Sequence, residues 1–251
     1  LFYNCGNYKS FGDKKFIPSV PAERVRRLIS SSKAASLFPD LLSIYGAVQY
    51  DIFCLDKTTA ELGFNSDGVT TYHSENVSKE DSDLVNRYMK EKKLEAWNTR
   101  LFKQQIDGKT ALVIKSASIN AGSTVDEFEG VQLVLEKGDY SEILLRKVAR
   151  EYAANDKQKE VIDKYVDHFT TGDLQAHREA SRVWIRDVDP AVEAFIGFFR
   201  EYRDPAGMRA EFKGLVTAVN KEVSKKFSLL VEKAEQFLPR LPWGKAYEKD
   251  K

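Results

Sequence analysis

The chain has 251 residues, of which 42% are hydrophobic and 12% aromatic, and this composition is typical of a folded protein with its own core. Its 39 basic and 38 acidic side chains are interspersed and give a formal net charge of +1, which argues against a nucleic-acid surface because phosphate binding needs clustered Lys and Arg. No apolar run approaches the roughly 18 residues of a membrane span, so we expect no membrane partner. Two cysteines, Cys5 and Cys54, are too few for a disulfide framework, and we expect free thiols and a cytoplasmic location.

The first part of the chain is predicted to form short helices. Pro21 is placed to begin one helix, and residues 33–47 form a second helical stretch. Ser78 and Asp81 have the spacing of a capping box, which predicts a helix over residues 79–91.

A change of period follows between residues 98 and 136. Apolar side chains alternate there with their neighbours, as at Val131, Leu133 and Leu135. This alternation predicts a small antiparallel β-barrel or sheet.

From Gly138 onward the pattern predicts helices. Asp139 is expected to cap the first of them. Gly172 and Asp173 have the residue types that end one helix and begin the next.

Two more helices are predicted near the end of the chain. The first begins at Asp189–Pro190 and carries an apolar stripe that ends at Tyr202. The second covers residues 206–237 and would be ~45 Å long at ~1.5 Å per residue, long enough to cross from one lobe into another. The fold class is therefore α+β and mostly helical.

Familiar catalytic motifs are missing from the sequence. The three histidines, His73, His168 and His177, form no H-E-x-x-H pattern, and there is no G-x-S-x-G elbow or G-x-G-x-x-G loop. Tyr202, at the end of its predicted helix, has two interpretations. It is either a capping core tyrosine or a hydrogen-bond donor for an oxyanion, with its ring toward the core and its hydroxyl outward.

Several segments spread over nearly the whole chain supply a further indication. They are G-N-Y-K-S-F-G-D at 6–13, G-V-T-T-Y at 68–72, N-T-R-L-F-K at 98–103, G-D-Y at 138–140, S-R-V-W-I-R-D at 181–187, Y-R-D-P at 202–205, A-E-F-K-G at 210–214, L-P-W at 241–243 and E-K-D-K at 248–251. In this order and spacing they resemble the dipeptidyl peptidase III family, zinc aminopeptidases that remove dipeptides from the N-termini of short peptides.

The resemblance implies a two-lobed metallopeptidase of which this chain is an incomplete part. Residues 1–220 would form a portion of the lower lobe, and residues 221–251 would begin the helical upper lobe that holds zinc. The family's H-E-L-L-G-H helix and its later glutamate are not in this sequence. We therefore expect the complete enzyme to bind zinc through residues outside this chain, and its partners to be short peptides and the rest of its own chain.

The resemblance also assigns roles to individual residues. Tyr202 matches a tyrosine that hydrogen-bonds the tetrahedral oxyanion, and Phe11 matches an aromatic residue that packs against bound peptide. A family glutamate that binds the substrate ammonium is replaced here by Arg200, with Glu201 as a neighbouring substitute, and Lys213 replaces another family glutamate. Because of these departures, a second hypothesis stays open: a non-catalytic peptide-binding or scaffold protein that retains the lower-lobe fold.

Overall fold

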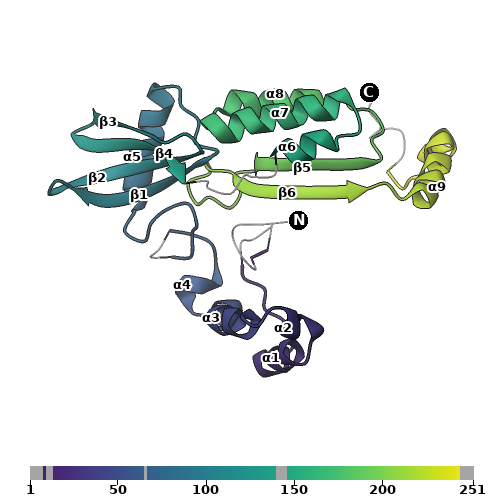
Figure 1. Cartoon of the computed structure of the whole chain (residues 1–251), viewed down its shortest axis with the longest axis horizontal. Coiled ribbons are helices and arrows are strands. Elements are labelled where there is room, and N and C mark those ends of the chain that lie inside the picture. The colour runs from purple at the N-terminus through teal and green to yellow at the C-terminus, as the bar shows by residue number, and fades with distance from the viewer. Residues whose placement is uncertain (1–7, 10–13, 65–66, 140–145, 244–251) are drawn as a thin grey trace.

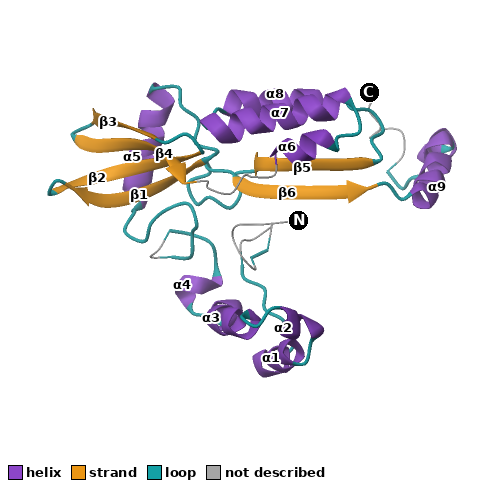
Figure 2. Ribbon diagram, in the orientation of Figure 1, coloured by secondary structure: helices purple, strands orange, loops and turns teal. Residues whose placement is uncertain are grey.

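The computed structural model describes residues 8–9, 14–64, 67–139 and 146–243. Within them the chain is α+β, with two separate β-sheets, each with helices on one face, and a group of short helices from residues 22–60 that lies apart from both sheets (Figures 1 and 2). In chain order the elements are α1 (Ala22–Ser30), α2 (Lys33–Leu37), α3 (Leu41–Phe53), α4 (Lys57–Ala60), α5 (Lys79–Glu91), β1 (Thr99–Ile106), β2 (Lys109–Ser118), β3 (Gly122–Phe128), β4 (Val131–Asp139), α6 (Arg146–Glu151), α7 (Asp156–Thr171), α8 (Leu174–Trp184), β5 (Val192–Phe199), β6 (Glu211–Ala218), α9 (Lys221–Glu232), α10 (Ala234–Phe237) and the 3-10 turn η1 (Leu238–Arg240).

The first sheet has the strand order β1-β2-β4-β3 and confirms the strands predicted from residues 98–136. Both hairpins turn through a residue and a glycine with positive φ, Asp107–Gly108 and Glu129–Gly130, as tight two-residue turns require. The purely antiparallel pairing that we expected is wrong at the centre. Strand β4 lies between β2 and β3 in the sheet. Because β3 runs opposite to β2 and β4 reverses direction again, β4 runs parallel to its neighbour β2.

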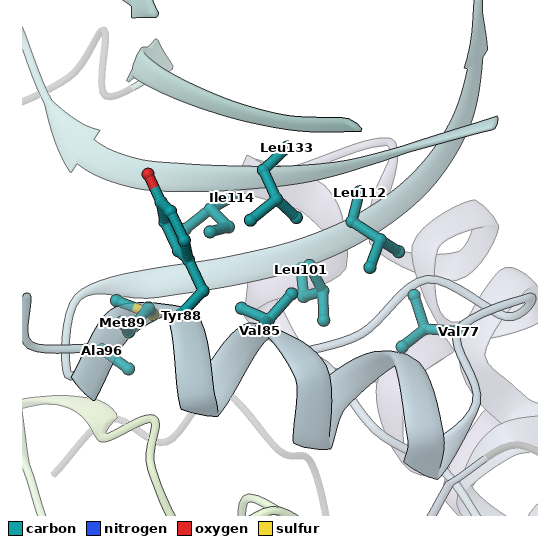
Figure 3. Packing of buried hydrophobic residues seen from close by; sticks show 9 residues of the cluster. All are labelled: Val77, Val85, Tyr88, Met89, Ala96, Leu101, Leu112, Ile114 and Leu133. Atoms are coloured by element: carbon teal, nitrogen blue, oxygen red, sulfur yellow. The ribbon is translucent and has the colours of Figure 1, made fainter. Parts of the chain in front are cut away.

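Helix α5 packs on one face of this sheet and forms the main core (Figure 3). Val85 and Met89 of the helix face Leu101, Leu112 and Leu133 from three different strands, and each of these side chains is at most 2% exposed. The predicted capping box at the start of α5 is confirmed: Ser78 Oγ accepts from the Asp81 N–H, and Asp81 accepts from the Ser78 N–H.

The second sheet is the antiparallel hairpin β5–β6, covered on one face by α7 and α8 (Figure 1). Phe198 of β5 packs against Phe169 of α7. The predicted junction of the two helices is confirmed, because Gly172 is left-handed at the end of α7 and the Asp173 side chain caps α8.

The hairpin corrects two helix predictions. Residues 192–199 are a nearly continuous apolar run, and such a run fits a buried strand as well as a helix. Aromatic and β-branched side chains favour the strand, and the partner strand β6 supplies the backbone hydrogen bonds. The predicted helix from Asp189 to Tyr202 is therefore wrong.

The long helix predicted over 206–237 is also wrong in its first part, because residues 211–218 form β6. Only α9 and α10 remain, with Asn220 as the cap of α9. No side chain of α9 is buried, and the helix projects beyond the far end of the hairpin (Figure 1). Residues 206–237 therefore do not form the single ~45 Å helix from which a crossing between two lobes was predicted.

Three smaller outcomes concern helix ends. The predicted stretch 33–47 is divided into α2 and α3 at Phe38–Asp40, where Pro39 interrupts the helix. The predicted cap at Asp139 is wrong, because Asp139 is the last residue of β4 and α6 begins at Arg146. None of the described helices has the length and hydropathy needed to cross a lipid bilayer.

Candidate functional site

The loop between β5 and β6, residues 200–210, carries the predicted site residues. It is closed at its base by the Arg200 carbonyl, which accepts a hydrogen bond of 3.0 Å from the Glu211 N–H. Arg200 itself has φ +66°, a left-handed conformation that is uncommon outside glycine. At the other edge the Ala210 N–H donates to the Trp97 carbonyl at 3.0 Å, which joins the loop to the start of the first sheet.

A turn at Asp204–Gly207 gives this loop its shape. Aspartate followed by proline is a strong turn signal, and the Gly207 N–H bonds back to the Asp204 carbonyl at 2.9 Å. The Asp204 carboxylate then accepts three backbone N–H groups, from Ala206 at 3.1 Å, Met208 at 3.0 Å and Arg209 at 2.8 Å. One buried carboxylate therefore fixes the loop from residue 204 to residue 209.

Two basic side chains surround this carboxylate. Arg209 Nη1 lies 3.7 Å from Asp204 Oδ2, and His73 Nδ1 lies 3.7 Å from Asp204 Oδ1, with all three side chains fully buried. His73 Nε2 is 3.3 Å from Arg209 Nη1 and 3.2 Å from Ser82 Oγ, so the network reaches helix α5. Burial and the Arg209 charge lower the pKa of His73 to about 4. Since a guanidinium can only donate, His73 Nε2 is the acceptor and the neutral ring carries its proton on Nδ1.

A second buried network holds the residue after Tyr202. Arg203 Nε lies 2.8 Å from Glu211 Oε1, and Lys213 Nζ lies 2.6 Å from Glu211 Oε2. Arg203 Nη2 donates to the Tyr8 carbonyl at 2.7 Å, across 195 positions of sequence. Lys213, which replaces the acidic residue expected from the family resemblance, is thus a buried partner of Glu211.

Comparison with known proteins decides the family. A sequence model of peptidase family M49 matches residues 44–251. The chain belongs to peptidase family M49. It is 42% identical to the dipeptidyl peptidase 3 of Rattus norvegicus and 40% identical to that of Homo sapiens, each over 269 residues and all of this chain. A dipeptidyl peptidase 3 of Nematostella vectensis is 40% identical over 272 residues.

This M49 chain spans a little over a third of the length of those relatives, 36% of the rat and human proteins and 37% of the Nematostella protein. The structure of DPP III from Caldithrix abyssi aligns with 88% of this chain and 39% of its own, with 14% identity and a TM-score of 0.47.

The predicted site residues of the M49 chain take different positions. Tyr202 is 71% exposed, so the expectation that its ring packs into the core is wrong. Glu201 is half-buried and Arg200 is exposed, and both lie in the loop rather than on a helix. Phe11 lies outside the described residues.

A pocket of ≈ 280 Å³ lies where the two sheets meet, beside this loop. Ala210, at the loop's end, is one of its lining residues, but Glu201 and Tyr202 are not. The other lining residues are Tyr72, Asn98, Thr99, Arg100, Phe102, Lys115, Ser116, Ala117, Gly138, Phe198 and Phe212. Tyr202 is therefore exposed on the surface of the loop and does not line this pocket.

The described part of the M49 chain does not fit a zinc ion. It contains no group of three or more His, Cys, Asp or Glu side chains that could hold a metal. His73 is engaged with Arg209 and Ser82, and His168 and His177 pack against each other with ring centroids 5.0 Å apart. That zinc is bound by residues outside this chain stays a prediction.

The pair formed by His168 and His177 belongs to the core between α7, α8 and β5. His168 Nδ1 donates to the Asp173 carbonyl at 2.8 Å, and burial lowers the pKa of both rings, that of His177 to about 4. Gly197, with φ +154°, lies directly against His177, since a Cβ at that position would be 2.5 Å from the ring's Cε1. Both histidines are neutral packing residues.

The loop is held by residues to which the sequence pattern assigned no such role: Arg203, Asp204, Arg209, Glu211 and His73. Four of them lie within nine positions of Tyr202, and a run of charged residues beside a proline turn is a signal that could have been read. That these charges are buried and paired with one another depends on residues far away in the sequence, so this could not have been predicted from the pattern.

Proposed function

We propose that this chain is part of a zinc-dependent dipeptidyl peptidase, which releases N-terminal dipeptides from short peptides, and that it supplies residues of the substrate cleft. The M49 match over residues 44–251 and the names of the relatives support this function. The observation that carries it is the exposed phenol of Tyr202, two residues after Arg200 at the base of a loop whose backbone is anchored by buried charges.

In this proposal Tyr202 donates a hydrogen bond to the oxyanion that forms when the peptide carbonyl is attacked. Such a donor must be accessible to substrate and must be held in place before the reaction begins. The exposure of the ring meets the first requirement, and the loop anchored through Arg203 and Asp204 meets the second.

Glu201 is proposed to contact the ammonium group of the substrate. It is half-buried beside Tyr202, and its backbone carbonyl accepts the Asp204 N–H at 3.3 Å, so its main chain belongs to the same turn. Arg200, which stands where the family has a glutamate, is exposed and brings a positive charge to the same surface. A free peptide N-terminus should therefore bind less tightly than it would beside two carboxylates.

Zinc in the complete enzyme would polarise the scissile carbonyl and activate water. The part of the chain that the structure describes provides no ligands for it, so the residues of this chain would bind and orient the peptide and stabilise the developing charge. Phe11 is proposed to pack against the bound peptide.

We also propose that residues 1–220 belong to the lower lobe and residues 221–251 to the start of the upper lobe. The complete absence of buried side chains in α9 supports a boundary near Asn220, because an amphipathic helix needs a surface to cover its apolar side. A cytoplasmic location is consistent with the unpaired Cys54.

The test compares the complete protein with the 251-residue chain. The complete protein should contain bound zinc and release free naphthylamine from dipeptidyl-naphthylamides, and a chelator should abolish this release. The 251-residue chain alone should do neither. Zinc-dependent turnover by the chain alone, or a zinc-free and inactive complete protein, would contradict the proposal. The second of these results would favour a non-catalytic peptide-binding or scaffold protein.

A further inference from the structure

One arginine joins the loop that carries Tyr202 to the N-terminal segment of the chain. Arg203 Nη2 donates to the Tyr8 carbonyl at 2.7 Å, and the same guanidinium, through Nε, binds Glu211 at the start of β6 at 2.8 Å. The Arg203 and Glu211 side chains are each only 4% exposed. A planar guanidinium can hold two partners in a fixed relative orientation, which an ammonium group cannot do.

The N-terminal segment is itself attached to helix α4. Tyr8 pairs with Lys15, and the Lys9 N–H donates to the Lys14 carbonyl at 2.9 Å. The Tyr8 hydroxyl donates to the Thr59 carbonyl at 2.6 Å, and the Lys15 N–H donates to the Ala60 carbonyl at 2.8 Å. Arg203 thus connects the loop that carries Tyr202 to a segment that is itself hydrogen-bonded to α4.

The Tyr202 side chain has little packing of its own to fix it. With 71% of its surface exposed, its position depends on the backbone that carries it, and the next residue in that backbone is Arg203. Lys213 contributes to the arrangement because it binds Glu211 Oε2 at 2.6 Å and leaves Oε1 for Arg203. The orientation of the guanidinium is therefore set from β6 as well as from Tyr8.

We infer that Arg203 is a positioning residue that locks the Tyr202 loop to the N-terminal segment, so that the two move as one unit. Both segments are ones that the proposed function assigns to the substrate site, through Tyr202 and Phe11. The effect on catalysis rests on that proposed function, whereas the mechanical coupling of the two segments does not.

The coupling is tested in the 251-residue chain by hydrogen exchange resolved to single amides. Arg203→Lys keeps the charge but loses the fixed fork, so the Lys9 and Lys15 amides should exchange about 10- to 100-fold faster, as expected for a lost charged hydrogen bond. The core amides of α5 should keep their rates. The control is Arg100→Lys, at an exposed arginine of β1. It should leave the exchange rates of the Lys9 and Lys15 amides and of the α5 core amides unchanged. Unchanged exchange at Lys9 and Lys15 in Arg203→Lys would overturn the inference.

A second measurement needs no variant. In the unmodified chain, exchange measured over increasing low denaturant should show the Lys15 and Glu211 amides opening with the same free energy and the same denaturant dependence. Separate openings of the two amides would also overturn the inference.

The catalytic part is tested by a double-mutant cycle in the complete protein. If Arg203 acts through Tyr202, Arg203→Lys should lower kcat by about 10- to 100-fold in the parent and have little further effect in a Tyr202→Phe background. If the losses of kcat in Arg203→Lys and Tyr202→Phe simply add in the double variant, Arg203 does not act by positioning Tyr202. A complete protein without peptidase activity would reject the proposed function while the exchange measurements still decided the coupling.

Discussion

The buried carboxylate of Asp204 offers the sharpest test of how the loop is held. Asp204→Asn preserves the size of the side chain and one of its oxygens, but it removes the negative charge beside Arg209 and turns an amide N–H₂ toward one of the three donating N–H groups. The side chains of Asp204 and Arg209 are both fully buried, so the positive charge of Arg209 would be left without its partner.

Removal of one member of a buried ion pair costs about 3–5 kcal/mol of unfolding free energy. For a chain of 251 residues, an unfolding entropy of about 2.1 cal/mol/K per residue converts this loss into a fall in Tm of about 6–10 °C. The assay is urea and thermal unfolding followed by far-UV circular dichroism. Asp163→Asn is the control, because Asp163 pairs with Arg150 on the exposed surface, and we expect no measurable change in Tm.

A double-mutant cycle separates the pair from the loop. Arg209→Met in the Asp204→Asn background removes the stranded charge, so the double variant should be more stable than the sum of the two single losses predicts. Two results would contradict the view that Asp204 and Arg209 form a buried, mutually dependent pair that shapes the loop. One is a loss of unfolding free energy below about 1 kcal/mol in Asp204→Asn, and the other is a double variant whose loss equals the sum of the two single losses.

Two further predictions concern Gly197 and the buried histidines. Gly197→Ala should destabilise the chain by about 1–3 kcal/mol, because the new Cβ would overlap the His177 ring, whereas Gly122→Ala, with nothing within 4 Å, should be tolerated; equal Tm values for the two variants would contradict this. His73 and His177 have folded-state pKa values of about 4, below the ordinary value of 6.5, so the unfolded chain binds more protons between these limits. Unfolding free energy should therefore fall as pH is lowered from about 6.5 to about 4, and His177→Gln should reduce this dependence in urea titrations; a flat profile would show that these histidines are not buried in the neutral form.

Local signals in the sequence were sufficient for several elements. The capping box at Ser78 and Asp81 and the Gly172–Asp173 junction depend only on residues a few positions apart, and both were confirmed. The alternation between residues 98 and 136 predicted the strands of the first sheet. Its parallel centre depends on which side of β4 receives β3, and alternation carries no information about that choice.

Long-range contacts explain what was missed. The run at 192–199 is apolar on both faces, and only its pairing with β6, whose residues were assigned to a helix, makes it a strand. The buried Arg209 approaches His73 across 136 positions, and Arg203 approaches Tyr8 across 195. The residue with the predicted role, Tyr202, could be named from the sequence, but the groups that hold it could not.

The central claim is that Tyr202 stabilises the oxyanion, and the most direct test is Tyr202→Phe in the complete protein. This variant removes one hydroxyl from an exposed ring, so the fold should be unaffected. The loss of one oxyanion donor predicts a fall in kcat of about 10²–10³-fold with little change in KM. A kcat that stays within about twofold of the parent value would contradict the account.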